Sequence, residues 1–383
     1  MWPNERKDYL RNPDRRFFGR IDRRLFTNFD WTLIILVTLL SAIGLVNLYS
    51  ATHHSEIASK FQLHLLWLVV GFVLMMLAFA INYQHLENAA YGIFIGVAVL
   101  LLATLIIGYV SHGARRWLYV GPLRFQPSEL AKIALVIALA KYLSANRPGD
   151  NFRFKDLGAP FAIAGAPILL VFLQPDLGTA VMLFLITLSM LLFVGIRWPT
   201  LLGLSTGGAL FSAFSYFFLL RDYQRERILT LFFPDRDPLG TGYHIRQSKI
   251  AIGSGRWLGK GWLEGTQAKL QFLPEHHTDF VFSVLGEEWG FLGGAVVLIL
   301  YFALIAWCLT IAMRSKDNFG ALMSVGLTAL LFWHIFINIG MVLGIMPVVG
   351  VPLPFLSYGR TNMLTVMISI GLLLNISSRR YIF

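Results

Sequence analysis

The chain has 383 residues, of which 56% are hydrophobic and 14% are charged. A soluble domain is typically about 25% charged, so the composition excludes an ordinary soluble protein and indicates an all-α polytopic membrane protein. The apolar runs are continuous rather than alternating, which argues against a transmembrane β-barrel. The single cysteine, Cys308, excludes an intrachain disulfide. Anionic lipid and membrane topology explain the net charge of +11, so we expect no nucleic-acid partner.

Residues 1–29 form a basic segment with eight lysines and arginines and four acidic residues. The segment is too long and too charged for the first part of a signal peptide. We therefore expect a cytoplasmic arm followed by a retained membrane span. The remaining residues, 30–383, are expected to form one transmembrane domain.

Ten apolar stretches are long enough, or nearly long enough, to cross a bilayer. They are 30–50, 62–81, 89–110, 128–144, 158–173, 177–196, 200–220, 289–313, 320–343 and 361–377. Three residues, 174–176, separate the fifth stretch from the sixth. These two stretches are therefore either a broken helix pair or a re-entrant element.

The distribution of basic residues predicts the orientation of these spans. With the N-terminus inside, the inner segments carry 17 lysines and arginines and the short outer segments carry five. Because cytoplasmic loops are enriched in these residues, both termini are expected in the cytoplasm. Four segments then face outward and hold most of the glycine, proline, arginine and carboxylate clusters: 111–127, 174–176, 221–288 and 344–360. We expect the chemistry at this outer face, where an activated substrate would arrive attached to lipid.

The large outer loop 221–288 lies between the seventh and eighth spans. It carries nine basic and nine acidic residues and is punctuated by glycine, so we expect it to pack on the bundle with short helices. Its stretch 255–261 resembles a nucleotide-binding P-loop only superficially, because the spacing is wrong and no Ser or Thr follows Lys260. We therefore expect no nucleotide. The glycines are more consistent with tight turns against the bundle.

The fourth span begins with a charged pair. In QPSELAK (126–132), Ser128 is expected to cap the helix, and Glu129 and Lys132 share one helix face. The pair is either a structural ion couple or a cation held ready for an anionic headgroup. Just upstream, Arg116 lies among aromatic residues in an outer loop, where arginine suits either phosphate binding or interfacial anchoring.

Three further positions are candidate polar sites. Asp176, at the break between two spans, is either a helix cap or a carboxylate that lines a site. Arg221 begins a basic cluster at a membrane exit, which is either an anchor or a contact for substrate. His276 lies three residues before Asp279, which is either a structural cap or a base. No transition-metal motif is present, so Mg²⁺ or Mn²⁺, bound loosely by carboxylates and lipid phosphate, is the metal to expect if one is used.

Five strings resemble those of the SEDS family (shape, elongation, division, sporulation), membrane glycosyltransferases that polymerise peptidoglycan. They are RRWLYVGPLRFQPSELAK (115–132), QPDLGTA (174–180), GYHIRQSKIAIGSGRWLGKG (242–261), GTQAKLQFLPEHHTDFVFSVLGEEWGFLG (265–293) and VPLPFLSYG (351–359). The fourth string is more similar to the elongation member RodA than to the division member FtsW. The ten-span plan matches the family as well.

The resemblance implies that Asp279 is the essential aspartate, and it carries over Arg116 and the Glu129–Lys132 pair. We predict Asp279 as the catalytic residue. The predicted substrate-binding residues are Arg116, Glu129, Lys132, Asp176, Arg221, His276 and Arg360. Arg360 stands where the family commonly has a small residue, so it either disturbs close packing at that turn or adds a phosphate contact.

The family also implies the reaction and the partners. The substrate is expected to be lipid II, a disaccharide-pentapeptide on undecaprenyl pyrophosphate, polymerised in the bacterial cytoplasmic membrane for elongation and rod shape. The expected partners are a class B penicillin-binding protein and other membrane proteins of the elongation complex. No Ser-His-Asp, GxSxG or SxxK pattern is evident in the outer loops, so serine acyl transfer is unsupported. The alternatives are a flippase for lipid-linked precursors and a non-catalytic scaffold.

Overall fold

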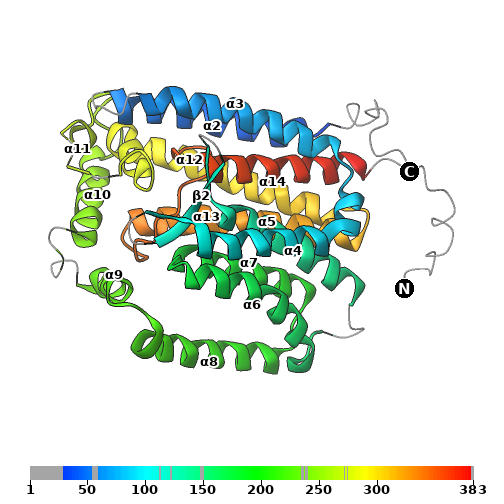
Figure 1. The fold of residues 1–383 in the computed structure, drawn as a ribbon. Helices are drawn as coiled ribbons and strands as arrows, with labels where there is room; N and C mark the ends of the chain where they lie inside the picture. The colour runs from blue at the N-terminus through cyan, green and yellow to red at the C-terminus, as the bar shows by residue number, and fades with distance from the viewer. Residues whose placement is uncertain are drawn as a thin grey trace.

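The computed structural model is a bundle of long helices whose axes are roughly parallel, and consecutive spans run in opposite directions (Figure 1). It describes residues 29–53, 59–111, 114–120, 123–146, 151–233, 237, 240–270, 272–273 and 275–380. The basic arm predicted at 1–29 lies outside the described residues, apart from its last residue.

The long helices match the ten predicted stretches. They are α2 (Trp31–His53), α3 (Ser59–Ala80), α4 (Tyr83–Ile107), α5 (Pro127–Ala145), α6 (Gly158–Leu173), α7 (Leu177–Val194), α8 (Trp198–Phe214), α12 (Val281–Met313), α13 (Asn318–Val342) and α14 (Arg360–Arg379). Short 3₁₀ and π segments, η2 (Phe154–Leu157) and η3 (Ser215–Leu219), extend α6 and α8. The predicted all-α polytopic membrane bundle is confirmed.

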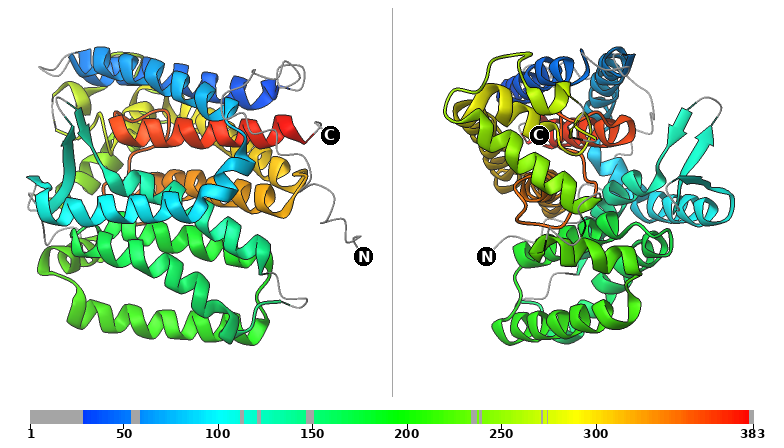
Figure 2. Two further views of the ribbon diagram at one scale, coloured as in Figure 1. Left: turned by 45° about the vertical axis from the view of Figure 1, so that its right-hand side comes forward. Right: turned by 90° about the vertical axis from the view of Figure 1, so that its left-hand side faces the viewer.

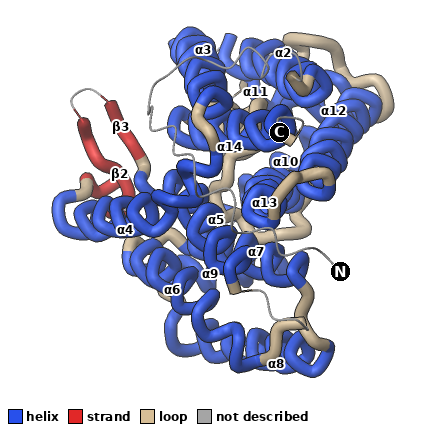
Figure 3. The backbone as a smooth tube through the Cα atoms, turned by 90° about the vertical axis from the view of Figure 1, so that its right-hand side faces the viewer, coloured by secondary structure: helices blue, strands red, loops and turns tan. Residues whose placement is uncertain are grey.

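Nine helices in the described part of the chain are long and apolar enough to cross a membrane, and α5 is not among them. The reason is chemical, because α5 carries Glu129, Lys132 and Lys141. Its 19 residues nevertheless measure about 28 Å at the α-helical rise, close to the thickness of the hydrocarbon core. The end-on view places α5 beside α13 and α14 in the middle of the bundle (Figure 3). Glu129 and Lys132 are therefore buried within the protein.

The helix α12 begins at Val281, eight residues before the predicted start of the eighth span at 289. Glu287 and Glu288 suggested a loop, but the fold gives each carboxylate a partner, and the Ser50 hydroxyl donates to Glu288. Glu287 is fully buried and accepts hydrogen bonds from Thr266, through both its backbone N–H and its hydroxyl at 2.9 Å, and Lys260 pairs with it at 2.5 Å. The outer loop therefore ends at Phe280, and Gly290, with φ 64°, kinks the helix where the apolar run begins.

The structure adds one feature that was not predicted from the sequence and corrects one prediction of a helix cap. The outer loop at 111–127 contains an antiparallel sheet of three short strands, β1 (Tyr109–Ser111), β2 (Ala114–Val120) and β3 (Leu123–Phe125). The cap of α5 is Gln126 instead of Ser128. The reason is that Pro127 occupies the first helical position, where its fixed φ suits the helix and its missing N–H costs nothing.

Short helices from the outer loop pack on the bundle, as predicted: α9 (Asp222–Phe232), α10 (Thr241–Gly255) and α11 (Thr266–Lys269). The glycines allow this packing. A Cβ atom on Gly255 would lie 2.0 Å from the backbone oxygen of Gly286, and one on Gly259 would lie 2.0 Å from that of Glu288. The backbone after α10 is therefore held directly against the start of α12.

We expect Gly290→Ala to lower the thermal unfolding temperature of the purified chain. At φ 64° a Cβ atom would be strained, and it would also lie 2.3 Å from the backbone nitrogen of Gly259. Strain of this kind costs about 1–3 kcal/mol. Gly96→Ala on α4 is the matched control, because nothing lies within 4 Å of the added methyl group. Equal unfolding temperatures for the two variants would contradict the close approach at Gly290.

The predicted outer segments gather at one end of the bundle. One end of the bundle, opposite to that where α14 terminates, carries the three-stranded sheet, the turn between α6 and α7, and the helices α9 to α11 (Figure 2). The segment 343–359 joins α13 to α14 at this same end. The alternation of spans therefore brings the four polar segments together.

Candidate active site

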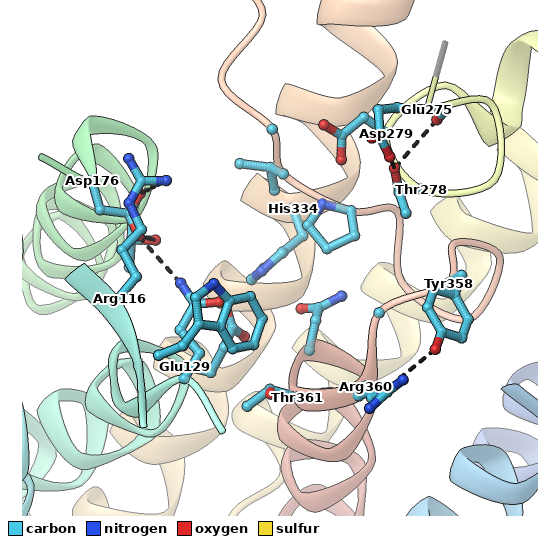
Figure 4. A pocket seen from close by; sticks show the side chains of 18 of the residues that line it. Arg116, Glu129, Asp176, Glu275, Thr278, Asp279, His334, Tyr358, Arg360 and Thr361 are labelled. Atoms are coloured by element: carbon cyan, nitrogen blue, oxygen red, sulfur yellow. Dashed lines mark hydrogen bonds and ion pairs between the residues drawn. The ribbon is translucent and has the colours of Figure 1, made fainter. Parts of the chain in front are cut away.

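A polar cavity of about 730 Å³ opens among the gathered segments. Its walls come from α3, β2, α5, α7, α9, the turn before α12, α13 and the segment that leads into α14. The charged residues and the histidine that line it are Lys60, Arg116, Arg124, Glu129, Lys132, Asp176, Arg227, Glu275, Asp279, His334 and Arg360. Figure 4 shows that the labelled side chains, among them Arg116, Asp279 and His334, converge from elements far apart in the sequence.

Asp279 lies at the edge of this cavity, in the tight turn before α12. Its backbone oxygen accepts a hydrogen bond from Asn338 Nδ2 at 2.9 Å, which ties the turn to α13. Gly350, with φ 72°, faces the carboxylate, and a Cβ atom on it would lie 3.3 Å from Oδ2. Burial raises the pKa of Asp279 to about 7, with a further increase from the charge of Glu275 and an opposing effect of Arg227. A carboxylate with this pKa suits general-base catalysis near neutral pH.

Glu275 provides a way to test that pKa. We expect Glu275→Gln to shift the acid limb of the pH–activity profile to lower pH, because removal of a neighbouring negative charge lowers the pKa of Asp279. The limb is read from initial rates of the expected reaction between pH 5 and 9. Glu264→Gln is the control, since Glu264 is exposed and does not line the cavity. An acid limb that moves to higher pH would contradict the assignment.

The predicted pair on α5 forms a buried triad with a histidine of α13. Lys132 Nζ lies 2.8 Å from Glu129 Oε1 and 2.9 Å from His334 Nε2. All three side chains are buried. The expectation that Glu129 and Lys132 share a face is confirmed, and Lys132 lines the cavity. Glu129 and Lys132 therefore form an ion pair, and its cation also lines a cavity that is large enough for a ligand.

Asp176 combines the two roles considered for it. Its side chain caps α7 by accepting hydrogen bonds from Thr179, and it also lines the cavity. Arg116, on β2, lies 3.8 Å from Asp176 Oδ1 and donates to the backbone oxygen of Pro175. The three-stranded sheet is therefore fastened to the turn between α6 and α7, and Arg116 also lines the cavity.

The opposite wall carries a second group of cations. Arg360 opens α14 and donates from Nε to the hydroxyl of Tyr358 at 3.0 Å. Lys60 Nζ, on α3, lies 2.7 Å from His277 Nε2. Burial, and after it the charge of Lys60, lowers the pKa of His277 to about 4, so the neutral ring accepts this hydrogen bond. The arginine that departs from the family pattern thus lines the cavity.

Two predicted residues do not line the cavity. Arg221 is the exposed cap of α9, and Arg227, six residues further on, reaches the cavity in its place. His276 is buried away from it, with Nδ1 2.8 Å from the backbone oxygen of Leu273. The cavity also has five ionisable lining residues that were not predicted from the sequence: Lys60, Arg124, Arg227, Glu275 and His334. For His334 a signal was present, because an ionisable residue within a membrane span is a functional candidate.

The comparisons with known proteins agree with this architecture. The model of the FtsW/RodA/SpoVE family, described as cell cycle proteins, matches residues 30–382. The peptidoglycan glycosyltransferase MrdB of Escherichia coli is 41% identical over 370 residues, covering 96% of this chain and 97% of that protein. The peptidoglycan glycosyltransferase RodA of Treponema pallidum is 32% identical, covering 92% and 98%.

Two solved structures are similar over nearly the whole chain. One is a chain of a peptidoglycan synthase complex that coordinates polymerisation and crosslinking, with a TM-score of 0.80, 33% identity and coverage of 93% of this chain and 99% of that one. The other is the rod shape determining protein RodA of Thermus thermophilus, with a TM-score of 0.69, 30% identity and coverage of 92% and 98%. The chain therefore belongs to the FtsW/RodA/SpoVE family, the SEDS family whose motifs its outer segments carry.

Proposed function

We propose that this chain is a peptidoglycan glycosyltransferase that polymerises lipid II into glycan strands for cell elongation. The relatives named above carry this activity in their names. The observation that carries the proposal is the cavity itself, in which the carboxylate of Asp279 lies among several cations. The named relatives favour a polymerase over the flippase considered from the sequence.

The reaction needs a base and a set of cations. A sugar hydroxyl of one lipid II attacks the anomeric carbon of another, a C–O bond forms, and the bond to the undecaprenyl pyrophosphate breaks. Asp279 would accept the hydroxyl proton. Lys132, Arg116 and Arg360 would offset the charge that grows on the leaving pyrophosphate. Glu129 would keep Lys132 charged and aimed.

A divalent cation would fit this site only with help from the substrate. Within the described residues, no group of three or more His, Cys, Asp or Glu is arranged to hold a metal ion. Glu275 and Asp279 both line the cavity and could supply two oxygen ligands. Mg²⁺ or Mn²⁺ would take its remaining ligands from water and pyrophosphate oxygens, as hard cations commonly do.

The same family supports a proposal for the partner and the membrane location. The similar chain in a synthase complex that coordinates polymerisation and crosslinking supports a class B penicillin-binding protein as partner. Such a partner would supply the acyl transfer for which this sequence has no serine motif. We also propose the bacterial cytoplasmic membrane, with both termini inside and the cavity facing outward.

This orientation predicts the labelling of two engineered cysteines. In a Cys308→Ala background, Lys269→Cys on α11 is expected to react with an impermeant maleimide in intact cells, and Lys316→Cys is expected to react only after lysis. Both positions are exposed and they lie at opposite ends of the bundle. The reverse pattern would overturn the proposed orientation.

The proposed activity is tested with the purified full-length chain and fluorescent lipid II. A ladder of glycan products on a gel is the expected result. Translocation of lipid II across vesicles without a ladder, measured with and without the class B partner, would instead favour the flippase.

A further inference from the structure

We propose that His334 is a positioning residue that aims the Lys132 ammonium at the substrate pyrophosphate. The inference rests on the proposed function and adds to it a residue outside the family motifs found in the sequence. His334 lies on α13, 202 residues away from Lys132 along the chain. It lines the same cavity as Lys132 and Glu129 (Figure 4).

The hydrogen atoms of the lysine can be assigned one by one. An ammonium group has three N–H donors. One points to Glu129 Oε1 at 2.8 Å and a second to His334 Nε2 at 2.9 Å. Because Lys132 also lines the cavity, the third donor is left for a ligand. Two fixed acceptors thus orient the one donor that remains.

The backbone sets the tautomer of His334. Its Nδ1 lies 2.8 Å from the carbonyl oxygen of Leu330, which can only accept, so Nδ1 carries the proton. In the neutral ring Nε2 is then bare and accepts from Lys132. A second proton on the ring would set two donors against each other. The bare Nε2 therefore leaves the Lys132 ammonium as the donor of this pair, and Lys132 lines the cavity.

The packing of two helices holds this geometry. A Cβ atom on Gly326 would lie 2.6 Å from Cγ1 of Val136, so the glycine lets α13 approach α5 closely. Gly326 lies about two helical turns before His334. The imidazole is buried, with 1% of its surface exposed, and therefore has little freedom to move away from Lys132. If Glu129 were its only partner, the Lys132 ammonium could rotate about that single hydrogen bond.

The first test compares two replacements of His334. His334→Leu removes the acceptor, whereas His334→Gln can offer its amide oxygen in the same place. We expect the Leu variant to lower kcat/KM for lipid II polymerisation about ten-fold or more, because a buried donor loses its partner and the ammonium reorients. The Gln variant should keep kcat/KM within about three-fold of the parental value. Thr328→Val, a buried change elsewhere on α13, controls for packing and should match the parental chain.

The second test measures binding of lipid II to the full chain in nanodiscs. His334→Leu is expected to weaken binding in the parental background and to have no further effect when Lys132→Met is already present, because residues that act as a unit are not additive. A direct contact of His334 with the substrate predicts a further loss in that background.

Three results would overturn the inference: parental kinetics for His334→Leu, equal damage by the Gln and Leu variants with a normal Thr328→Val, or a further loss of binding in the Lys132→Met background. A parental chain that binds lipid II but makes no glycan would overturn the proposed function instead. The binding measurements would still report whether His334 and Lys132 act together.

Discussion

Asp279→Asn is expected to abolish glycan polymerisation. The amide keeps the size and hydrogen bonding of the carboxylate but cannot accept the proton of the acceptor hydroxyl. Loss of a general base typically lowers the rate about 10²–10⁴-fold, which is on the order of 3–5 kcal/mol in the activation barrier. Gel analysis of fluorescent lipid II products measures the loss, and thermal unfolding of the same sample verifies that the variant is folded.

The matched control for this change is Asp222→Asn. Asp222 is fully exposed on α9 and does not line the cavity, so the same replacement there should leave the rate unchanged. The parental enzyme should also lose activity as the pH falls through about 7, since the base must be unprotonated and burial raises the pKa of Asp279 to about 7. Abundant product from Asp279→Asn, or full activity at pH 5, would remove Asp279 from the reaction.

Lys132→Met is expected to produce the second-largest loss of activity and to lower stability as well. The substitution removes a cation from the cavity and leaves Glu129 buried without its partner. Breaking one side of a buried ion pair typically costs about 3–5 kcal/mol, although protonation of the carboxylate can relieve part of this cost. Lipid II turnover and the thermal unfolding temperature are measured on the same preparation.

A charge-balanced variant separates the two effects. Glu129→Gln combined with Lys132→Met leaves no uncompensated charge, so stability should return while turnover stays low. Lys141→Met, on the same helix but packed on Tyr91 outside the cavity, is the control for the chemical change and should be active. If the double variant polymerises lipid II at the parental rate, the pair is purely structural.

Whether a cavity residue could be predicted from the sequence depends on whether it lies in a short sequence motif. Asp279, Arg116, Glu129 and Lys132 belong to compact motifs, so a resemblance carried by short strings was sufficient to locate them. Arg227 lines the cavity and Arg221 does not, because the direction of α9 decides which side chain reaches the cavity, and that direction comes from packing and not from charge clustering.

Hydropathy and the outer motifs by themselves determined the membrane class, the ten spans and the location of the polar segments. The reason is that the length and apolarity of a span are local properties of the chain. Only the tertiary structure decided that Glu287 lies within a helix and that His334 meets Lys132. Both outcomes depend on partners far away in the sequence, since a buried charge is tolerated only where the fold supplies a partner for it.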